Sequence, residues 1–229
     1  MSKVVFCVPS LNGPTPPFIA AMEQAIAPVI AAGWDEGLVE ERGNPYISSA
    51  RALMLRRALD AKADVIVFLD YDISFPPETL LQLIETPGDV VAGTYRFKAD
   101  DERYMGELEP GPVVRADGCV KASLVPAGFL KITTDAVHKL IGAYPELCYG
   151  ARFAPHFDLF SHGAFENVWW GEDYAFSRRW RAMGEDIWLD PRWRIDHHKC
   201  VDGEWQAYQG DYHDWLQRQP GGRKWKGAT

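Results

Sequence analysis

The sequence predicts an α/β fold with a mostly parallel central sheet and helices on both of its faces. Runs rich in β-branched and aromatic residues, typical of strands buried on both faces, occur at 3–8 and 64–69. Segments with helical character separate the first strands, which favours parallel β-α-β units. The second half of the chain has a different pattern, and there we expect a smaller antiparallel part.

The first half carries local signals for each element. Proline at Pro28 predicts a bend in the first helix, and Gly33 is placed to end it. Asn44 followed by Pro45 is typical of a helix N-cap with proline in the first turn. We expect strands at 3–8, 37–41, 64–69 and 89–92, and helices at 18–31, 45–61 and 76–85.

The second half begins with a hairpin signal, because Asp117-Gly118 separates two short apolar runs. Thr133 or Thr134 is placed to cap a helix, and Gly184 follows the end of another. The segment 144–170 is aromatic and lacks a clear period, so we expect a long functional loop. The remaining expected elements are a hairpin at 113–122, strands at 126–132 and 186–189, helices at 133–140, 171–183 and 205–216, and a basic tail at 223–226.

Composition restricts the class of protein. The formal net charge of −8 gives no general electrostatic reason for binding nucleic acid or a membrane surface. The four cysteines are scattered without a C-x-x-C pair, which suits reduced thiols in a cytosolic protein. No apolar run reaches the length of a membrane span, and no signal peptide precedes the first strand. We therefore expect a soluble, cytoplasmic protein, or one of the host cytoplasm if it is viral.

Acidic residues follow the buried strand at 64–69. Asp70 and Asp72 are separated by one residue and lie where a parallel sheet binds ligands, beyond the carboxyl ends of its strands. Two such carboxylates can bind a divalent cation, which can in turn bind phosphate oxygens. Asp173 at a helix start and His197 near the end of the sheet region complete the pattern. Each of these signals alone is weak.

Arg51 lies in the middle of the apolar face that the helix at 45–61 should present. An unpaired charge is costly on a buried face, so this arginine needs an anionic partner. Two partners satisfy the pattern equally well. One is an ion pair within the protein, and the other is a bound ligand's phosphates or base.

Several segments together resemble the GT-A glycosyltransferases, especially the large inverting family 2. The resemblance extends over residues 3 to 198, and the combination is more specific than any one motif. The segments are Ser49-Ala50-Arg51-Ala52-Leu53, Phe68-Leu69-Asp70-Tyr71-Asp72-Ile73-Ser74-Phe75-Pro76, Pro126-Ala127-Gly128-Phe129-Leu130, Glu172-Asp173-Tyr174-Ala175-Phe176 and Ile187-Trp188-Leu189-Asp190-Pro191, the last leading to His197.

This resemblance implies a GT-A fold and a metal-dependent, inverting transfer of one sugar from a nucleoside-diphosphate sugar, for which we expect a UDP-linked donor. Mn²⁺ or Mg²⁺ would be held by Asp70, Asp72 and His197, with His198 the second choice because Asp196 replaces a small residue of the family. Asp173 would be the general base, next to Glu172 in the same motif. The family's Q-x-x-R-W-type element and membrane helices are missing, so a processive polymerase is not expected.

The resemblance also divides the single domain, 1–229, into a nucleotide-sugar half at 1–98, an acceptor and catalytic half at 99–200, and a C-terminal helix and tail at 201–229. Glu41 stands where the family commonly has aspartate. The expected donor-binding residues are Pro9, Ser10, Asn12, Glu41, Arg51 and Tyr71. The expected acceptor-binding residues are Trp169, Trp170 and His162.

Three other functions share parts of this pattern. A haloacid-dehalogenase-type phosphatase also has a D-x-D after a strand, but places it at the first strand. A sugar nucleotidyltransferase should have a basic, Gly-rich loop after strand one, and 9–14 contains no lysine or arginine. A non-catalytic carbohydrate-binding or nucleotide-sugar-binding protein would need neither metal nor Asp173. The acceptor is left open among a glycan or lipid head group, a protein and a hydroxylated base in DNA.

Overall fold

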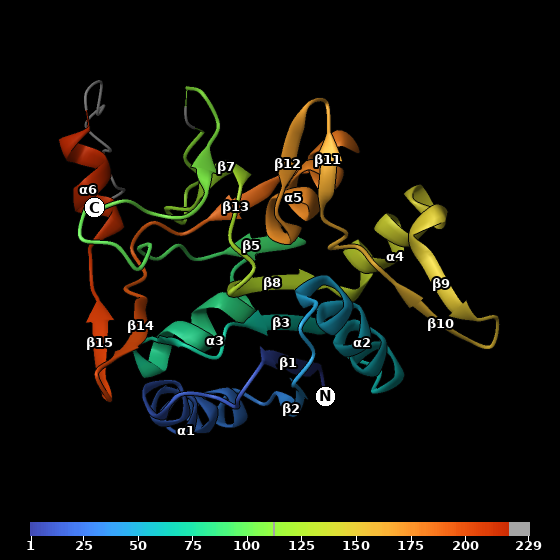
Figure 1. Ribbon diagram of the computed structural model, residues 1–229, viewed down its shortest axis with the longest axis horizontal. Coiled ribbons are helices and arrows are strands. Elements are labelled where there is room, and N and C mark those ends of the chain that lie inside the picture. Colours follow the sequence, from blue (N-terminus) through green and yellow to red (C-terminus); the bar gives the residue numbers. More distant parts are fainter. Residues whose placement is uncertain (112, 220–229) are drawn as a thin grey trace.

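The computed structural model describes residues 1–111 and 113–219 as a mixed α/β structure with one large sheet (Figure 1). Eight strands form this sheet in the order β2-β1-β3-β8-β5-β13-β7-β6. Their bounds are β1 Lys3–Ser10, β2 Asp35–Arg42, β3 Val65–Leu69, β5 Val90–Ala92, β6 Glu107–Leu108, β7 Val120–Leu124, β8 Phe129–Thr133 and β13 Ile187–Leu189. The helices of the described residues are α1 Pro16–Ala31, α2 Ile47–Asp60, α3 Pro77–Glu85, α4 Thr134–Ala143, α5 Glu172–Ala182 and α6 Tyr212–Arg218.

The large sheet is mixed, which corrects the expectation of a mostly parallel one. Among the described strands, three of its pairings are parallel and four are antiparallel. Two of the antiparallel pairings come from β8, which lies between β3 and β5 and so separates two strands of the first half. The other two join β7 to β13 and to β6. A helix between the strands that end at 69 and begin at 90 indicates that these two strands are parallel. It does not show that a later strand, β8, lies between them in the sheet. The two predicted halves therefore share one sheet.

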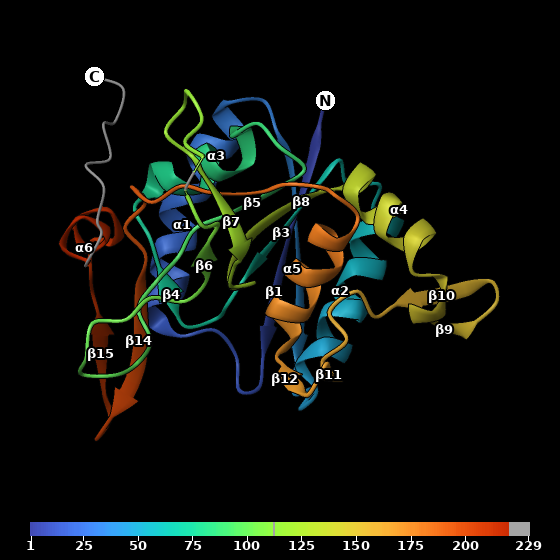
Figure 2. The same cartoon turned by 90° about the horizontal axis from the view of Figure 1, so that it is seen from above.

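Helices cover both faces of the sheet, as predicted. Figure 2 shows α1 and α3 on one side, with α2, α4 and α5 on the other. Each side has its own apolar core. Phe18 of α1 and Leu80 of α3 belong to one buried cluster, whereas Met54 of α2 and Trp180 of α5 belong to the other. Alternate residues of the central strands supply both clusters, which explains why these strands read as continuous apolar runs.

A small three-stranded sheet at one end brings His197 to the predicted metal site (Figure 1). Its strands are β4 Ile73–Ser74, β14 Asp196–Val201 and β15 Glu204–Tyr208, and β14 pairs antiparallel with both others. The predicted helix at 205–216 is wrong in its first part. Asp202 and Gly203, both with positive φ, close a hairpin between β14 and β15, so the helix begins only at Tyr212.

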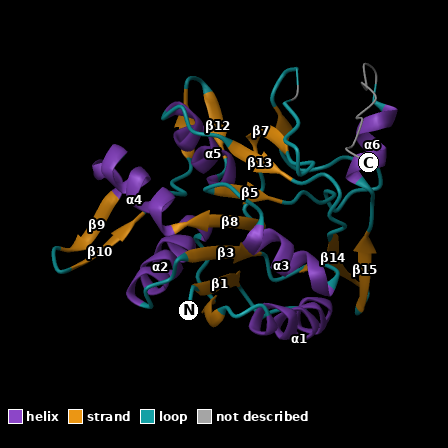
Figure 3. Ribbon diagram, turned by 180° about the vertical axis from the view of Figure 1, so that it is seen from behind, coloured by secondary structure: helices purple, strands orange, loops and turns teal. Residues whose placement is uncertain are grey.

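The aromatic segment 144–170 is more ordered than the predicted loop. It contains a 3₁₀ turn and two hairpins, the second of which leads directly into α5. Figure 3 shows the first hairpin extending from the body of the molecule beside α4. The bounds are Pro145–Leu147 for the turn, β9 Cys148–Ala151, β10 Ala154–Phe157, β11 Gly163–Phe165 and β12 Val168–Trp170.

Local differences from the expected elements are small. Asn44 accepts a hydrogen bond from the Tyr46 amide, so it closes a turn before α2, and Tyr46 takes the N-cap position that we assigned to Asn44. Of the predicted hairpin at 113–122, only the second arm is a strand, and Val114 forms an isolated bridge to Val120. Thr133 caps α4 as predicted, since its hydroxyl accepts from the Ala136 amide. The predicted basic tail at 223–226 lies outside the described residues.

Candidate functional site

The two acids of the D-x-D triplet lie at the carboxyl end of β3, in the turn between β3 and β4. The Asp70 amide donates to the Gly128 carbonyl at 2.9 Å, and the Asp72 carbonyl accepts from the His198 amide at 2.7 Å. Segments distant in sequence therefore fix both ends of the triplet. Asp70 is fixed to the strand entering β8, and Asp72 is fixed to β14.

Asp70 is held by partners on both carboxylate oxygens. Arg51 Nη2 lies 3.0 Å from Oδ1, and the Tyr95 hydroxyl donates to Oδ2 at 3.0 Å. Gly128 packs closely against this carboxylate, since a Cβ there would lie 2.0 Å from the Tyr95 hydroxyl and 2.3 Å from Asp70 Oδ2. The close approach of Asp70 and Tyr95 leaves no room for a side chain at position 128, which explains the glycine in the segment 126–130.

Arg51 forms the ion pair within the protein. Its side chain is only 2% exposed, and it contacts Glu172 at 3.5 Å in addition to Asp70. Its guanidinium lies beside the packed rings of Phe68 and Phe160, with centroids at 5.3 and 5.5 Å. Burial lowers its pKa, but the two carboxylates outweigh burial and the pKa is raised. The internal ion pair is thus present, and contact of Arg51 with a donor stays a prediction.

Asp72 has different neighbours from Asp70. Its Oδ1 lies 3.6 Å from His197 Nε2, and its Oδ2 forms an ion pair with Lys98. His197 Nδ1 lies 2.9 Å from the Arg96 carbonyl oxygen, which requires a hydrogen on Nδ1 and leaves Nε2 facing Asp72. Burial raises the pKa of Asp72, but the contacts with His197 and Lys98 outweigh this effect, so the pKa lies below its usual value.

The short segment from Tyr95 to Lys98 contacts all three predicted metal ligands, and none of these contacts was predicted from the sequence. The Tyr95 hydroxyl donates to Asp70, the Arg96 carbonyl accepts from His197, and Lys98 pairs with Asp72. Tyr95 also packs edge-on against the His197 ring, with centroids 4.9 Å apart. The segment follows β5, and the expected strand at 89–92 placed it at the correct edge of the sheet. Its individual contacts depend on tertiary structure.

Asp173 is the second residue of α5, near the Asp70 side of the site. Burial raises the pKa of Asp173 to about 7, with a further contribution from Glu172, against lowering by the Tyr174 amide and Arg51. The Tyr174 amide donates to its Oδ1 at 2.7 Å. Glu172, by contrast, is engaged with Arg51. The pKa of Asp173, about 7, suits proton transfer near neutral pH.

Of the predicted donor-binding residues, Pro9, Ser10 and Asn12 lie at the end of β1 and in the loop that follows it, and Glu41 lies on the neighbouring strand β2. Pro9 pairs with Glu41 and Ser10 with Arg42 in the register of β1 and β2. The Ser10 hydroxyl donates to Glu40 Oε1 at 3.2 Å. Glu41 instead forms an ion pair with Arg57 of α2 at 2.8 Å. Glu40, which sequence reasoning passed over, is thus the acid beside Ser10.

The loop after β1 is tied to the D-x-D turn. Thr15, the N-cap of α1, donates to the Tyr71 carbonyl from both its amide and its hydroxyl, each at 3.0 Å. Tyr71 is half-buried, whereas Asn12 is exposed. The loop is therefore placed directly beside the metal candidates, as its predicted role in donor binding requires.

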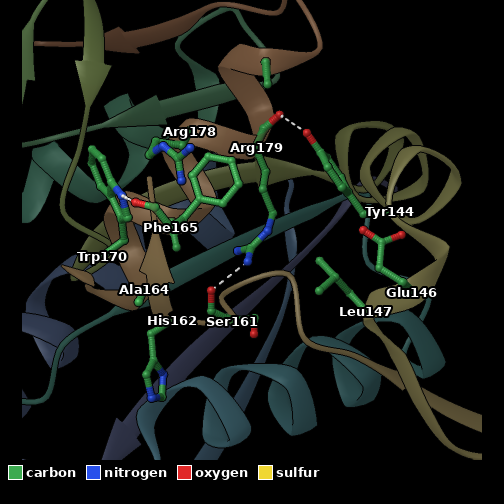
Figure 4. Close-up of a pocket in the computed structure, with 13 residues that line it drawn as sticks. Tyr144, Glu146, Leu147, Ser161, His162, Ala164, Phe165, Trp170, Arg178 and Arg179 are labelled. Atoms are coloured by element: carbon green, nitrogen blue, oxygen red, sulfur yellow. Dashed lines mark hydrogen bonds between the residues drawn. The ribbon is translucent and has the colours of Figure 1, made fainter. Parts of the chain in front are cut away.

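The predicted acceptor residues lie on or just before the hairpin that precedes α5. Trp169 is 69% exposed, and its ring is tilted against His162 with centroids 5.9 Å apart. Trp170 donates from its indole nitrogen to the Phe165 carbonyl. Trp170 and His162 line a cavity of about 350 Å³ beside α5, shown in Figure 4, where Arg178 lies between Phe165 and Trp170.

That cavity faces away from Asp173. Ala175, Arg178, Arg179 and Ala182 line it. At about 100° per residue these positions lie across the helix from Asp173. The cavity is therefore separate from the D-x-D site, although Trp170 belongs to the short connection between them. Trp169 is the predicted acceptor residue with the largest open aromatic surface.

The structure does not bring Asp70, Asp72 and His197 together as three ligand atoms around one point. In the part of the chain that the structure describes, the one such group is Asp211, His213 and Asp214, near the start of α6. Asp72 and His197 form a two-residue set with one oxygen and one nitrogen: the carboxylate oxygen suits Mn²⁺ or Mg²⁺, and imidazole nitrogen is a common metal ligand. The bond from His197 Nδ1 to a carbonyl is the arrangement that supports histidine ligands.

Comparisons with known proteins concern the fold. No protein-family model matches the sequence, and no curated protein sequence matches it. Among solved structures, A197 from STIV superposes with a TM-score of 0.58 at 17% identity, over 93% of this chain and 92% of that chain. S. aureus TarS residues 1–349 in complex with UDP gives 0.46 at 13% identity, over 95% of this chain and 64% of that chain.

A glycosyltransferase involved in the glycosylation of the major capsid of PBCV-1 gives a TM-score of 0.34 at 10% identity, over 64% of this chain and 68% of that chain. In the described residues, no helix is long and apolar enough to cross a membrane. The comparison with A197 shows that this chain shares its fold.

Proposed function

We propose that the chain is a metal-dependent glycosyltransferase of the GT-A type, which transfers one sugar with inversion from a nucleoside-diphosphate sugar, UDP-linked, to an acceptor hydroxyl. One observation carries this proposal. A carboxylate–imidazole pair, Asp72 and His197, lies at the same sheet edge as an aspartate whose pKa is raised to about 7. The sequence motif at 68–76 contains Asp72, and the motif at 172–176 contains Asp173.

The metal would be held by Asp72 and His197, with Asp70 fixing the turn that presents Asp72. When bound, Mn²⁺ or Mg²⁺ supplies positive charge that stabilises the leaving diphosphate. In this proposal Asp70 does not bind the metal, because its two carboxylate oxygens already contact Arg51 and Tyr95. Ser10 and the loop after β1 would contact the nucleoside.

Asp173 would accept the proton of the acceptor hydroxyl as that oxygen attacks the anomeric carbon. A base with a pKa of about 7 is ionised in about half of the molecules at neutral pH and still accepts a proton effectively. Glu172 contributes by raising the pKa of Asp173 and by neutralising Arg51. Trp169 would offer its exposed ring to the acceptor.

The first experiment is a panel of nucleoside-diphosphate sugars, with and without Mn²⁺, assayed by release of the nucleoside diphosphate. We expect Mn²⁺-dependent release from UDP-linked donors. Absence of both turnover and metal-dependent donor binding, for every donor, would contradict the proposal. Donor binding without turnover by the wild type would instead indicate a nucleotide-sugar-binding protein.

The base assignment predicts a pH dependence. Because Asp173 must be ionised to accept a proton, the rate at saturating donor should rise with pH and reach half of its plateau near pH 7. Asp173→Asn should lower the rate by about 10² to 10⁴-fold and leave donor affinity unchanged. Glu185→Gln, which removes a surface carboxylate paired with Lys139, is the matched control. A rate that is independent of pH from 5 to 9 would contradict the assignment.

A further inference from the structure

Lys98 occupies a position that the proposed mechanism does not use. Its ammonium pairs with Asp72 Oδ2, on the opposite side of the carboxylate from His197. The Lys98 side chain is 27% exposed and that of Asp72 is 11% exposed, so the pair lies at the boundary between protein and solvent. A partly desolvated pair of this kind is stronger than one fully in water.

The backbone around Lys98 is fixed. Arg96 and Tyr104 form an antiparallel bridge, and the Phe97 amide donates to the Arg103 carbonyl at 3.0 Å. The Arg96 guanidinium donates to the carbonyls of Ala99 and Asp100, which closes the loop from inside. The ammonium can still change partner, because the lysine side chain has four flexible methylene groups.

A divalent cation at Asp72 and His197 would place two cations on one carboxylate. The repulsion between the ammonium and the metal ion would then favour departure of Lys98 from Asp72. A diphosphate bound to the same ion would bring anionic oxygens beside the vacated ammonium. Lysine is well suited to this second contact, since it binds phosphate as a mobile point charge.

We propose that Lys98 exchanges partners on donor binding: it neutralises Asp72 in the free protein and contacts a diphosphate oxygen of the donor in the complex. This inference rests on the proposed function and adds a residue to its donor site. It predicts that removal of the Lys98 ammonium changes two binding affinities in opposite directions. The metal ion alone should bind more tightly, and the metal–nucleotide complex should bind more weakly.

The test compares Lys98→Met with wild type in two titrations that do not depend on turnover. Mn²⁺ alone is titrated by the electron paramagnetic resonance signal of the free ion, and UDP is titrated calorimetrically in saturating Mn²⁺. A charge-assisted contact corresponds to about a tenfold change in affinity. We expect Lys98→Met to bind Mn²⁺ about tenfold more tightly and UDP with Mn²⁺ about tenfold more weakly. Lys98→Arg should lie between these values and wild type.

Lys121→Met is the matched control, since Lys121 is similarly exposed and pairs with Asp186 on another part of the sheet. It should change neither titration. If Lys98→Met weakens both titrations or leaves both unchanged, the exchange of partners is wrong while the proposed function stands. If wild type binds UDP in neither the presence nor the absence of Mn²⁺, the proposed function fails and the role of Lys98 fails with it.

Discussion

Asp70 and Asp72 are separated by one residue, yet they lie in regions of opposite character. Asp70 belongs to an interior cluster in which Arg51, Tyr95 and Gly128 leave little freedom. Asp72 is the more buried carboxylate, with 11% of its side chain exposed against 28% for Asp70, but it faces His197 and the partly exposed Lys98. A D-x-D triplet therefore need not supply two equivalent ligands. One acid can build the turn while the next one binds.

The largest expected effect concerns the interior cluster. Arg51→Met should lower the free energy of unfolding by about 3 to 5 kcal/mol, because it leaves the Asp70 and Glu172 carboxylates without their counter-charge. Urea unfolding followed by tryptophan fluorescence measures this loss. Arg57→Met, on the exposed side of the same helix, removes the pair with Glu41 and a long contact with the Glu40 carbonyl, and should cost less than about 1 kcal/mol. Equal losses of unfolding free energy in Arg51→Met and Arg57→Met would contradict the view that the interior cluster is more important for stability than the exposed pair.

A methyl group at Gly128 should also disturb the interior cluster. In Gly128→Ala the new Cβ would overlap both the Tyr95 hydroxyl and the Asp70 carboxylate, which should lower the free energy of unfolding by about 1 to 3 kcal/mol. Gly142→Ala is the control, because no atom lies within 4 Å of a Cβ there and alanine favours the helix. We expect opposite changes in the melting temperature of the two variants. A stable Gly128→Ala would show that the contact is not tight.

The two acids should differ in their contributions to stability. Asp70→Asn should lower the free energy of unfolding by about 2 kcal/mol, since it weakens charge-assisted hydrogen bonds of a buried arginine. Asp72→Asn should lower it by a smaller amount, because the Lys98 side chain is 27% exposed and can turn to solvent when the charge of Asp72 is removed. Chemical denaturation of both variants under one condition gives the comparison. A larger loss for Asp72→Asn would reverse the roles we assign.

Asp173 adds a pH dependence to stability. Its folded pKa of about 7 lies above the value of an exposed aspartate, so the folded state holds a proton that the unfolded state releases. The contribution of Asp173 to stability is therefore fully present below about pH 4 and is lost as the pH rises to about 7. Asp173→Asn should remove this part of the dependence. Parallel stability curves for wild type and variant from pH 4 to 8 would contradict the raised pKa.

The sequence was most informative where a local pattern determines the structure. The apolar run before Asp70 correctly placed the end of β3, and Gly171-Glu172-Asp173 correctly placed the start of α5. The pairing of β8 between β3 and β5 was missed, because register between distant strands leaves no local signal. The hairpin at Asp202-Gly203 did have a signal, and the helical interpretation of 205–216 overlooked it.

The candidate site was predictable to a similar extent. The pattern located Asp72, Asp173 and His197 at one edge, but the partners of each depend on tertiary contacts. Arg51 illustrates the limit, because its place on an apolar helix face indicated an anionic partner without identifying it. Lys98 was missed because a lysine in an exposed, charged segment has no distinguishing pattern.

The central claim is that Asp72, rather than Asp70, binds the metal that holds the donor's diphosphate. The most direct measurement is calorimetric binding of UDP to Asp70→Asn and Asp72→Asn, each with and without Mn²⁺. We predict that Asp70→Asn retains Mn²⁺-dependent binding and that Asp72→Asn loses it while remaining folded. Mn²⁺-dependent binding by Asp72→Asn at the wild-type affinity would contradict the account.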